Sequence, residues 1–176
     1  MKIVAIFFIF SAAVVMIHHV EENGCLNCKD ACNTDVAGQE YIDINGVCSG
    51  NNTCCKPCSD TCGGSFTGPM GSFTSPNFPS NYCNNQDCYF NITVEDGDRV
   101  MLNFTTLHTA SDDDFLQVHN GEIEDIFQTF FYNGGPFPPT EIEISDNPSS
   151  NKIIVQLHSD ETQTQPGFQV TYKTFW

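Results

Sequence analysis

From residue 62 to the end of the chain, hydrophobic and polar residues alternate in short runs. Side chains two residues apart lie on the same face of a β-strand, so each run predicts a strand with one buried and one exposed face. Clusters of Gly, Pro, Asn and Asp separate the runs and predict turns. Several short strands divided in this way predict an all-β sandwich of two antiparallel sheets. The residues expected to face the core are Phe90, Ile92, Val94, Val100, Leu102, Phe104, Ile153, Val155, Leu157, Phe168, Val170 and Tyr172.

The ten cysteines of the chain all lie between Cys25 and Cys88. An even number of cysteines in an exported chain of this size predicts disulfides. Residues 21–61 are polar and carry seven of the ten, so crosslinks must stabilise this short segment in place of a hydrophobic core. The last half of the chain has no cysteine and must be held by packing. We therefore expect a small disulfide-rich region at residues 21–61, followed by the sandwich at residues 62–176.

Residues 1–20 have the pattern of a secretory signal peptide, because a charged start is followed by the apolar run from Ile3 to Ile17. That run is too short to span a bilayer comfortably, and no later stretch is apolar enough to do so. We therefore expect a secreted, extracellular protein that does not insert into a membrane.

Three sequons for N-glycosylation fit an extracellular protein, and they begin at Asn51, Asn91 and Asn103. Asn91 and Asn103 both fall on the polar face of their predicted strands, where a glycan has room.

The chain is strongly acidic, with 22 Asp and Glu residues against 6 Lys and Arg residues and a net charge of −16. Such a charge repels nucleic acid and anionic membranes and favours basic ligands or calcium. We therefore exclude nucleic acid as a partner.

An ordered series of motifs makes residues 62–176 resemble a CUB domain, which is an extracellular antiparallel β-sandwich of the jelly-roll type. The resemblance covers about two thirds of the chain, and it implies a recognition protein that binds extracellular proteins or glycans without catalysing a reaction. The motifs are Cys62-Gly63-Gly64, Ser75-Pro76-Asn77-Phe78-Pro79, Cys88-Tyr89-Phe90-Asn91-Ile92, Asp114-Phe115-Leu116-Gln117-Val118, Ser159-Asp160 and Gly167-Phe168-Gln169-Val170-Thr171-Tyr172.

The resemblance also implies a disulfide between Cys62 and Cys88. The family's second disulfide is missing, because the expected positions near Ser111 and Tyr132 lack cysteine. Its loss costs a few kcal/mol, and we expect packing of the aromatic residues 130–132 to offset that cost.

Cys83 is an additional cysteine, at a position where the family more often has proline. In one scheme Cys83 pairs with one of the seven cysteines of residues 21–61 and docks that region on the sandwich. In the other scheme Cys83 pairs locally with Cys88, and Cys62 pairs within the front region. We favour the first scheme because Cys62-Gly63-Gly64 is similar to the opening of the family, although sequence alone does not fix connectivity.

Many CUB domains bind calcium at one end of the sandwich through a glutamate and two aspartates. The resemblance maps the aspartates onto Asp114 and Asp160, and it finds no match for the glutamate. Asp112 or Asp113 could replace it, since calcium tolerates flexible oxygen coordination; the competing interpretation is a solvated acidic turn. In the family, the calcium-ordered loops grip a lysine or arginine side chain of a protein partner.

Zinc binding and catalysis are not expected. The pairs Cys25-x2-Cys28 and Cys55-x2-Cys58 have zinc-like spacing, but oxidised cysteines cannot bind the metal. No nucleophile or zinc-peptidase motif is present, and His119 and His158 are predicted on strand surfaces. The sequence therefore predicts a non-enzymatic protein.

The cysteine-rich region offers an alternative function. Its second half, from Cys48 to Cys62, looks like part of a four-disulfide core of the whey acidic protein type, whose members often inhibit peptidases or attack microbes. Its first half departs from that pattern, because Cys25, Cys28 and Cys32 are crowded together. We favour a crosslinked spacer beside a recognition domain, and the alternative is a peptidase inhibitor or defence protein whose head carries the activity.

Overall fold

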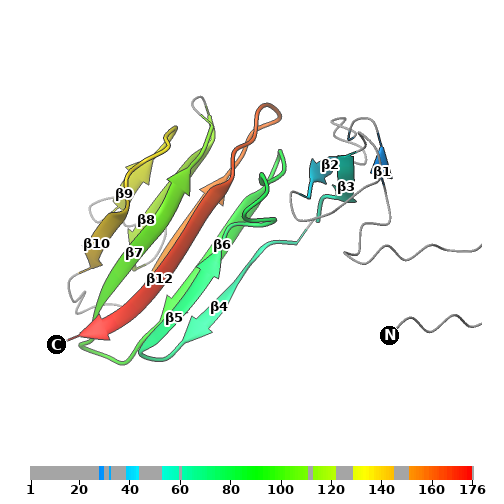
Figure 1. The fold of residues 1–176 in the computed structure, drawn as a ribbon. Coiled ribbons are helices and arrows are strands. Elements are labelled where there is room, and N and C mark those ends of the chain that lie inside the picture. Colours follow the sequence, from blue (N-terminus) through cyan, green and yellow to red (C-terminus); the bar gives the residue numbers. More distant parts are fainter. Residues whose placement is uncertain are drawn as a thin grey trace, which may run out of the picture.

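The computed structural model of the chain describes residues 28–29, 32, 39–43, 53–59, 61–110, 113–121, 129–144 and 151–175. Within these residues the chain forms strands alone, in three sheets (Figure 1). We call residues 28–59 the head and residues 62–175 the sandwich. The head contains β1 (Cys28–Lys29), β2 (Glu40–Ile42) and β3 (Thr53–Pro57). The sandwich contains β4 (Gly63–Thr67), β5 (Met70–Thr74), β6 (Asp87–Thr93), β7 (Arg99–His108), β8 (Phe115–Asn120), β9 (Thr129–Tyr132), β10 (Thr140–Ile144), β11 (Lys152–His158) and β12 (Gly167–Phe175).

The sandwich consists of a four-stranded sheet in the order β10-β7-β12-β5 and a five-stranded sheet in the order β4-β6-β11-β8-β9. Neighbouring strands pair antiparallel, except that β4 runs parallel to β6. The all-β sandwich predicted from the sequence is confirmed, with this one parallel pair at an edge.

The core lies between the two sheets, and every residue that the alternation predicts to face it is buried. Phe168 lies at its centre, where its ring meets the rings of Phe73, Phe90 and Phe104 edge-on at centroid distances of 5.3–5.9 Å. Edge-to-face contacts of this kind stabilise aromatic pairs beyond the area they bury.

The prediction of a surface position was wrong for His119. His119 lies on the outer face of β8 but is only 3% exposed, because it is flanked by Ile154 of β11 and Thr129 of β9. His158 does lie at the surface, where it pairs with the Asp87 carboxylate.

Of the three aromatic residues 130–132 expected to pack in place of the missing disulfide, two make ring contacts. Tyr132 packs against the core and meets the ring of Phe137 at 5.7 Å. The Phe131 ring contacts that of Phe115 at 5.3 Å but is 53% exposed, and Phe130 is 40% exposed, because β9 is an edge strand among the described residues. The corresponding position at Ser111 lies outside the described residues.

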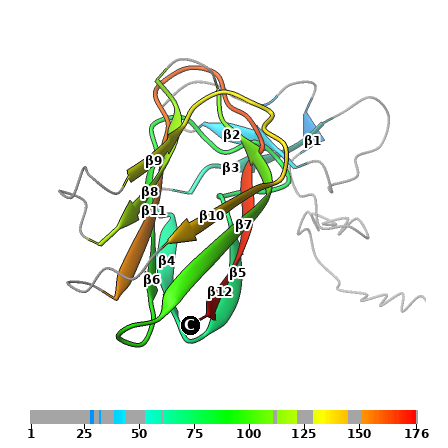
Figure 2. The same cartoon turned by 90° about the vertical axis from the view of Figure 1, so that its left-hand side faces the viewer.

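The head is a small sheet in the order β1-β3-β2 that lies beyond one end of the sandwich, while the C-terminal end of β12 is at the opposite end (Figures 1 and 2). A disulfide from Cys32 to Cys55 crosslinks the head internally, and a disulfide from Cys58 to Cys83 joins it to the sandwich. Cys62 and Cys88 form a disulfide inside the sandwich, the pair that the family resemblance implies. The first of the two pairing schemes for Cys83 is therefore the one found.

Candidate functional site

Three loops meet at the end of the sandwich next to the head, and we call them together the loop end. They are residues 75–86 between β5 and β6, residues 109–114 between β7 and β8, and residues 159–166 between β11 and β12. Residues 111–112 are outside the described part of the chain. Hydrogen bonds join each loop to the other two, so the loop end forms one connected unit.

Asp114 is the central residue of this unit, and its side chain is only 1% exposed. Its Oδ2 accepts a hydrogen bond from the Tyr82 hydroxyl at 2.5 Å, and its Oδ1 accepts one from the backbone N–H of Asp160 at 2.8 Å. The Tyr82 hydroxyl in turn accepts the backbone N–H of Ala110 at 2.8 Å. One carboxylate therefore connects all three loops.

Burial sets the ionisation of this pair. Removal from water raises the pKa of Asp114 above its ordinary value, and the nearby negative charge of Asp160 raises it further. The hydrogen bonds from Tyr82 and from the Asp160 N–H oppose that shift, since they stabilise the charged carboxylate. Burial, together with the bond to Asp114, also raises the pKa of Tyr82, so the phenol stays protonated and able to donate.

Ser159, the serine of the Ser159-Asp160 motif, joins two loops of the loop end by hydrogen bonds. Its hydroxyl donates to the Cys83 carbonyl at 2.8 Å and accepts the backbone N–H of Gln86 at 2.9 Å. Its own backbone N–H donates to the Gln86 carbonyl at 2.9 Å. Ser159 thereby holds the segment that carries the Cys83 disulfide.

Whether the loop end could bind calcium depends on the positions of its Asp114 and Asp160 carboxylates. Asp114 and Asp160 lie close enough for their charges to interact, but Oδ1 of Asp160 already accepts the backbone N–H of Thr162 at 2.7 Å. Calcium takes six to eight oxygen ligands. The described residues contain no group of three or more His, Cys, Asp or Glu side chains that could hold a metal, and Asp112 lies outside them. These residues alone do not complete a calcium site.

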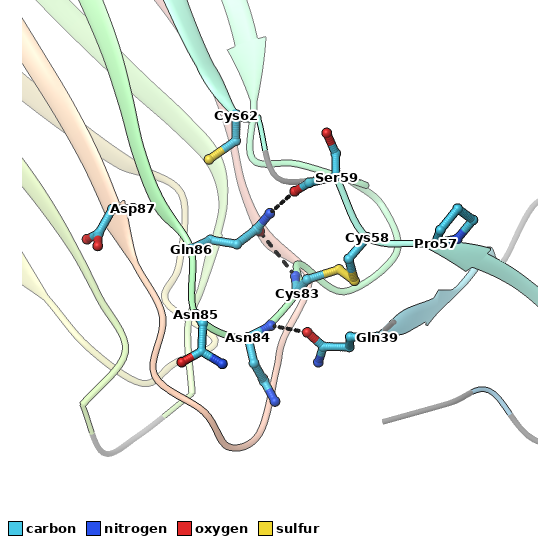
Figure 3. Close-up of a pocket in the computed structure, with 10 residues that line it drawn as sticks. All are labelled: Gln39, Pro57, Cys58, Ser59, Cys62, Cys83, Asn84, Asn85, Gln86 and Asp87. Atoms are coloured by element: carbon cyan, nitrogen blue, oxygen red, sulfur yellow. Dashed lines mark hydrogen bonds between the residues drawn. A yellow bond between two sulfur atoms is a disulfide. The ribbon is translucent and has the colours of Figure 1, made fainter. Parts of the chain in front are cut away.

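A pocket of about 380 Å³ lies between the head and the loop end (Figure 3). Two hydrogen bonds cross this junction beside the Cys58–Cys83 disulfide. The Gln39 Oε1 accepts the backbone N–H of Asn84 at 3.0 Å, and the Gln86 Nε2 donates to the Ser59 carbonyl at 3.1 Å (Figure 3). The pocket therefore has one wall from each part of the molecule.

Most of the residues that line the pocket are polar. Asp87 is the charged residue among those that line it, and its carboxylate is 57% exposed. Oδ1 of Asn84 is buried and has no hydrogen-bond donor among the residues that the structure describes. A ligand that carries hydrogen-bond donors and positive charge complements such a lining.

The charged side chains of the loop end all have the same sign. The loop end carries Asp113, Asp114, Asp160 and Glu161, and none of its described residues is Lys or Arg. Arg99, Lys152 and Lys173 lie toward the opposite end of their strands. In the head, Lys29 and Lys56 are paired with Glu40 and Asp43.

The predicted glycosylation sites separate into two groups. Asn91 and Asn103 lie on outward faces of β6 and β7 and are partly exposed, whereas Asn51 lies outside the described residues. Their occupancy stays a prediction.

The sequence alone did not identify Tyr82 as a partner of Asp114, or Gln86 and Asn84 as residues that line the pocket. The signal for Tyr82 was its place just before the additional cysteine, in a loop that otherwise contains small polar residues. Gln86 and Asn84 gave no signal, because their roles depend on a docked head.

No helix of the described residues is long and apolar enough to cross a membrane.

Comparison with known protein families shows that the family described as CUB domain matches residues 62–172. Human cubilin is 37% identical over 108 residues, which cover 58% of this chain and 3% of cubilin. Mouse procollagen C-endopeptidase enhancer 2 is 36% identical over 116 residues, which cover 64% of this chain and 27% of the enhancer. The chain thus spans less than a third of either relative.

A solved structure shows the same architecture. The CUB1-EGF-CUB2 structure of human MASP-1/3 matches with a TM-score of 0.50 and 24% identity, over 85% of this chain and 55% of that one. The MASP-1 CUB2 domain bound to Ca²⁺ also matches, with a TM-score of 0.47 and 24% identity over 64% of this chain and 99% of that one. The bound calcium is a property of that domain.

Proposed function

Because the chain belongs to the CUB domain family, we propose that it is a secreted, non-enzymatic recognition protein whose loop end binds a basic side chain of an extracellular protein. The observation that carries the proposal is the charge of the loop end, where acidic residues gather and Lys and Arg are absent from the described residues. A cleft or end of one charge sign attracts ligands of the opposite sign and rejects like-charged ones.

The pocket at the junction is the proposed point of contact. Its lining includes the Asp87 carboxylate, whose Oδ1 also pairs with Nδ1 of His158 at 2.7 Å, and the buried Oδ1 of Asn84. A lysine or arginine side chain supplies a positive donor for the Asp87 carboxylate, and hydrogen bonds to charged groups are worth about 1.5–3 kcal/mol each. An ammonium or guanidinium group therefore fits the lining better than a neutral or acidic group.

The test uses short peptides of defined charge. We expect acetyl-Gly-Arg-Gly-amide and acetyl-Gly-Lys-Gly-amide to shift the backbone NMR signals of Asn84 and Gln86, and acetyl-Gly-Gln-Gly-amide to leave them unchanged. Added salt should weaken the effect, because salt screens exposed charges. Asp87→Asn should reduce the affinity about tenfold. Asp96→Asn is the matched control, since it removes the same charge from an exposed turn at the far end of the sandwich.

Equal binding of the glutamine peptide, or equal binding by the Asp87→Asn variant, would contradict the proposal. Binding of neutral oligosaccharides in the same assay, with no response to the basic peptides, would instead support a glycan as the ligand. Inhibition of a secreted peptidase by the protein would favour the alternative in which the head carries the activity.

Calcium dependence stays a prediction from the sequence, with Asp114, Asp160 and Asp112 as its ligands. It requires that millimolar calcium raise the melting temperature and that Asp160→Asn abolish the rise. Calcium at ten times its Kd would stabilise the fold by about 1.4 kcal/mol. A melting temperature that does not respond to calcium would rule the site out.

A further inference from the structure

The outer face of β6 places an aromatic ring beside a glycosylation sequon. Tyr89, Asn91 and Thr93 alternate with buried residues along the strand, so all three point away from the core. Consecutive residues of a strand are about 3.3 Å apart, so residues two positions apart are separated by about 6.6 Å on one face. The Tyr89 ring is therefore within reach of the first sugar attached to Asn91.

The Tyr89 ring is exposed and held in position, so that such a sugar can stack on it. The Tyr89 side chain is 36% exposed, and its hydroxyl accepts a hydrogen bond from Nε2 of Gln156 on β11 at 3.1 Å. On the other side its strand neighbour is Gly63 of β4, which has no side chain to cover the ring. The orientation of the ring is thus fixed on one side, and the space beside it is open on the other.

The side-chain amide of Asn91, to which the glycan attaches, is free to be modified. N-linked glycans attach to Nδ2 of asparagine, and the Asn91 side chain has no hydrogen-bond partner in the part of the chain that the structure describes. Four asparagines outside sequons differ from Asn91, since Nδ2 of Asn77, Asn81, Asn84 and Asn151 donates to a backbone carbonyl in each case.

We propose that an N-glycan on Asn91 folds onto Tyr89, so that its first N-acetylglucosamine stacks on the ring and shields the outer face of β6. The faces of a pyranose ring carry C–H groups, so stacking removes apolar surface of both partners from water. The proposal rests on secretion through the glycosylating compartment, which belongs to the proposed function. It leaves the loop end open for the partner.

The second sequon supplies an internal control. Asn103 also lies on an outward strand face, but the residue two positions before it is Met101, and its strand neighbours are Thr171 and Glu141. No aromatic side chain occupies the position that Tyr89 holds beside Asn91. A glycan on Asn103 therefore has no ring on which to stack.

A double-mutant cycle on protein secreted from mammalian cells tests the proposal, with site occupancy measured by mass spectrometry. Thr93→Ala removes the Asn91 glycan and keeps the asparagine. We expect Thr93→Ala to lower the melting temperature about 4 °C more when Tyr89 is present than in a Tyr89→Ser background. Tyr89→Phe keeps the ring and should preserve this coupling. The parallel cycle of Thr105→Ala with Met101→Ser should show none.

Each outcome decides the proposal. If Asn91 is occupied and the two backgrounds respond equally to Thr93→Ala, the glycan does not stack on Tyr89. If Asn91 is unoccupied in secreted protein, the proposal fails at its first step, whereas binding of the basic peptides to unglycosylated protein still tests the proposed function separately.

Discussion

In the sandwich a continuous cluster of aliphatic and aromatic side chains fills the space between two sheets, whereas the head buries only Cys54, Cys55 and Asp43 among its described residues. The head instead has crosslinks within a sheet of short strands. Small segments cannot bury enough apolar surface to offset the conformational entropy lost on folding, so crosslinks must reduce the entropy of their unfolded state. The same chain thus stabilises its two parts by different means.

The largest expected effect is on the core. Phe168→Ala removes a ring that is 0% exposed and contacts three other rings, so we expect it to lower the free energy of unfolding by about 3–5 kcal/mol. Denaturant unfolding under non-reducing conditions measures the loss. Met70→Ala is the control, because Met70 is 71% exposed and surface substitutions usually change stability by less than about 0.5 kcal/mol. Equal losses for the two variants would show that the sandwich is not held by its core.

The second prediction separates the two parts. Replacing Cys58 and Cys83 together with alanine removes the disulfide that joins head to sandwich. We expect a loss of about 3 kcal/mol, from the loop of 25 residues that this bond closes, with the sandwich still folded. Limited proteolysis should then cut the head while the sandwich resists.

A double replacement of Cys62 and Cys88 is the matched control, since it removes a disulfide of similar sequence separation from inside the sandwich. It should destabilise the sandwich core and leave the Cys58–Cys83 junction in place. If loss of the junction disulfide unfolds the sandwich as well, the two parts are not independent.

The third prediction concerns the loop end, which is stabilised by buried hydrogen bonds. Tyr82→Phe deletes the hydroxyl that donates to Asp114 and accepts the N–H of Ala110. Leaving buried polar groups unpaired costs about 1–3 kcal/mol, so we expect a loss of about 2 kcal/mol in thermal unfolding. Tyr89→Phe removes a hydroxyl from an exposed ring and should cost much less. If Tyr82→Phe leaves the stability unchanged, water replaces the hydrogen bonds of the hydroxyl with Asp114 and Ala110.

How far the sequence predicts this structure depends on the kind of interaction. Alternation fixed which residues face the core, because the side-chain period of a strand is independent of its partners. It failed for His119, whose burial depends on Ile154 and Thr129 in neighbouring strands. The partner of Cys83 was narrowed to a group of cysteines, since connectivity depends on how the head docks. The pocket could not be predicted at all, because Asn84 and Gln86 line it only when the head is in place.

The smallest expected effect is a pH dependence that comes from Asp114 in the sandwich. Burial raises the pKa of Asp114 in the folded state above its unfolded value of about 4. Between these two values the folded chain binds more protons than the unfolded chain, so the free energy of unfolding falls as the pH rises through that interval. Below the unfolded pKa this contribution is fully present.

Asp114→Asn removes the titrating group, so the stability of the wild type relative to this variant should decrease as the pH rises from 4. Denaturant titrations at several pH values measure that difference. Asp96→Asn changes the net charge equally in an exposed turn and corrects for the general effect of charge. The two hydrogen bonds that Asp114 accepts lower its pKa, and burial is the largest effect that raises it. If the stability of the wild type relative to Asp114→Asn stays constant or grows with pH, Asp114 is therefore better solvated than its 1% exposure implies.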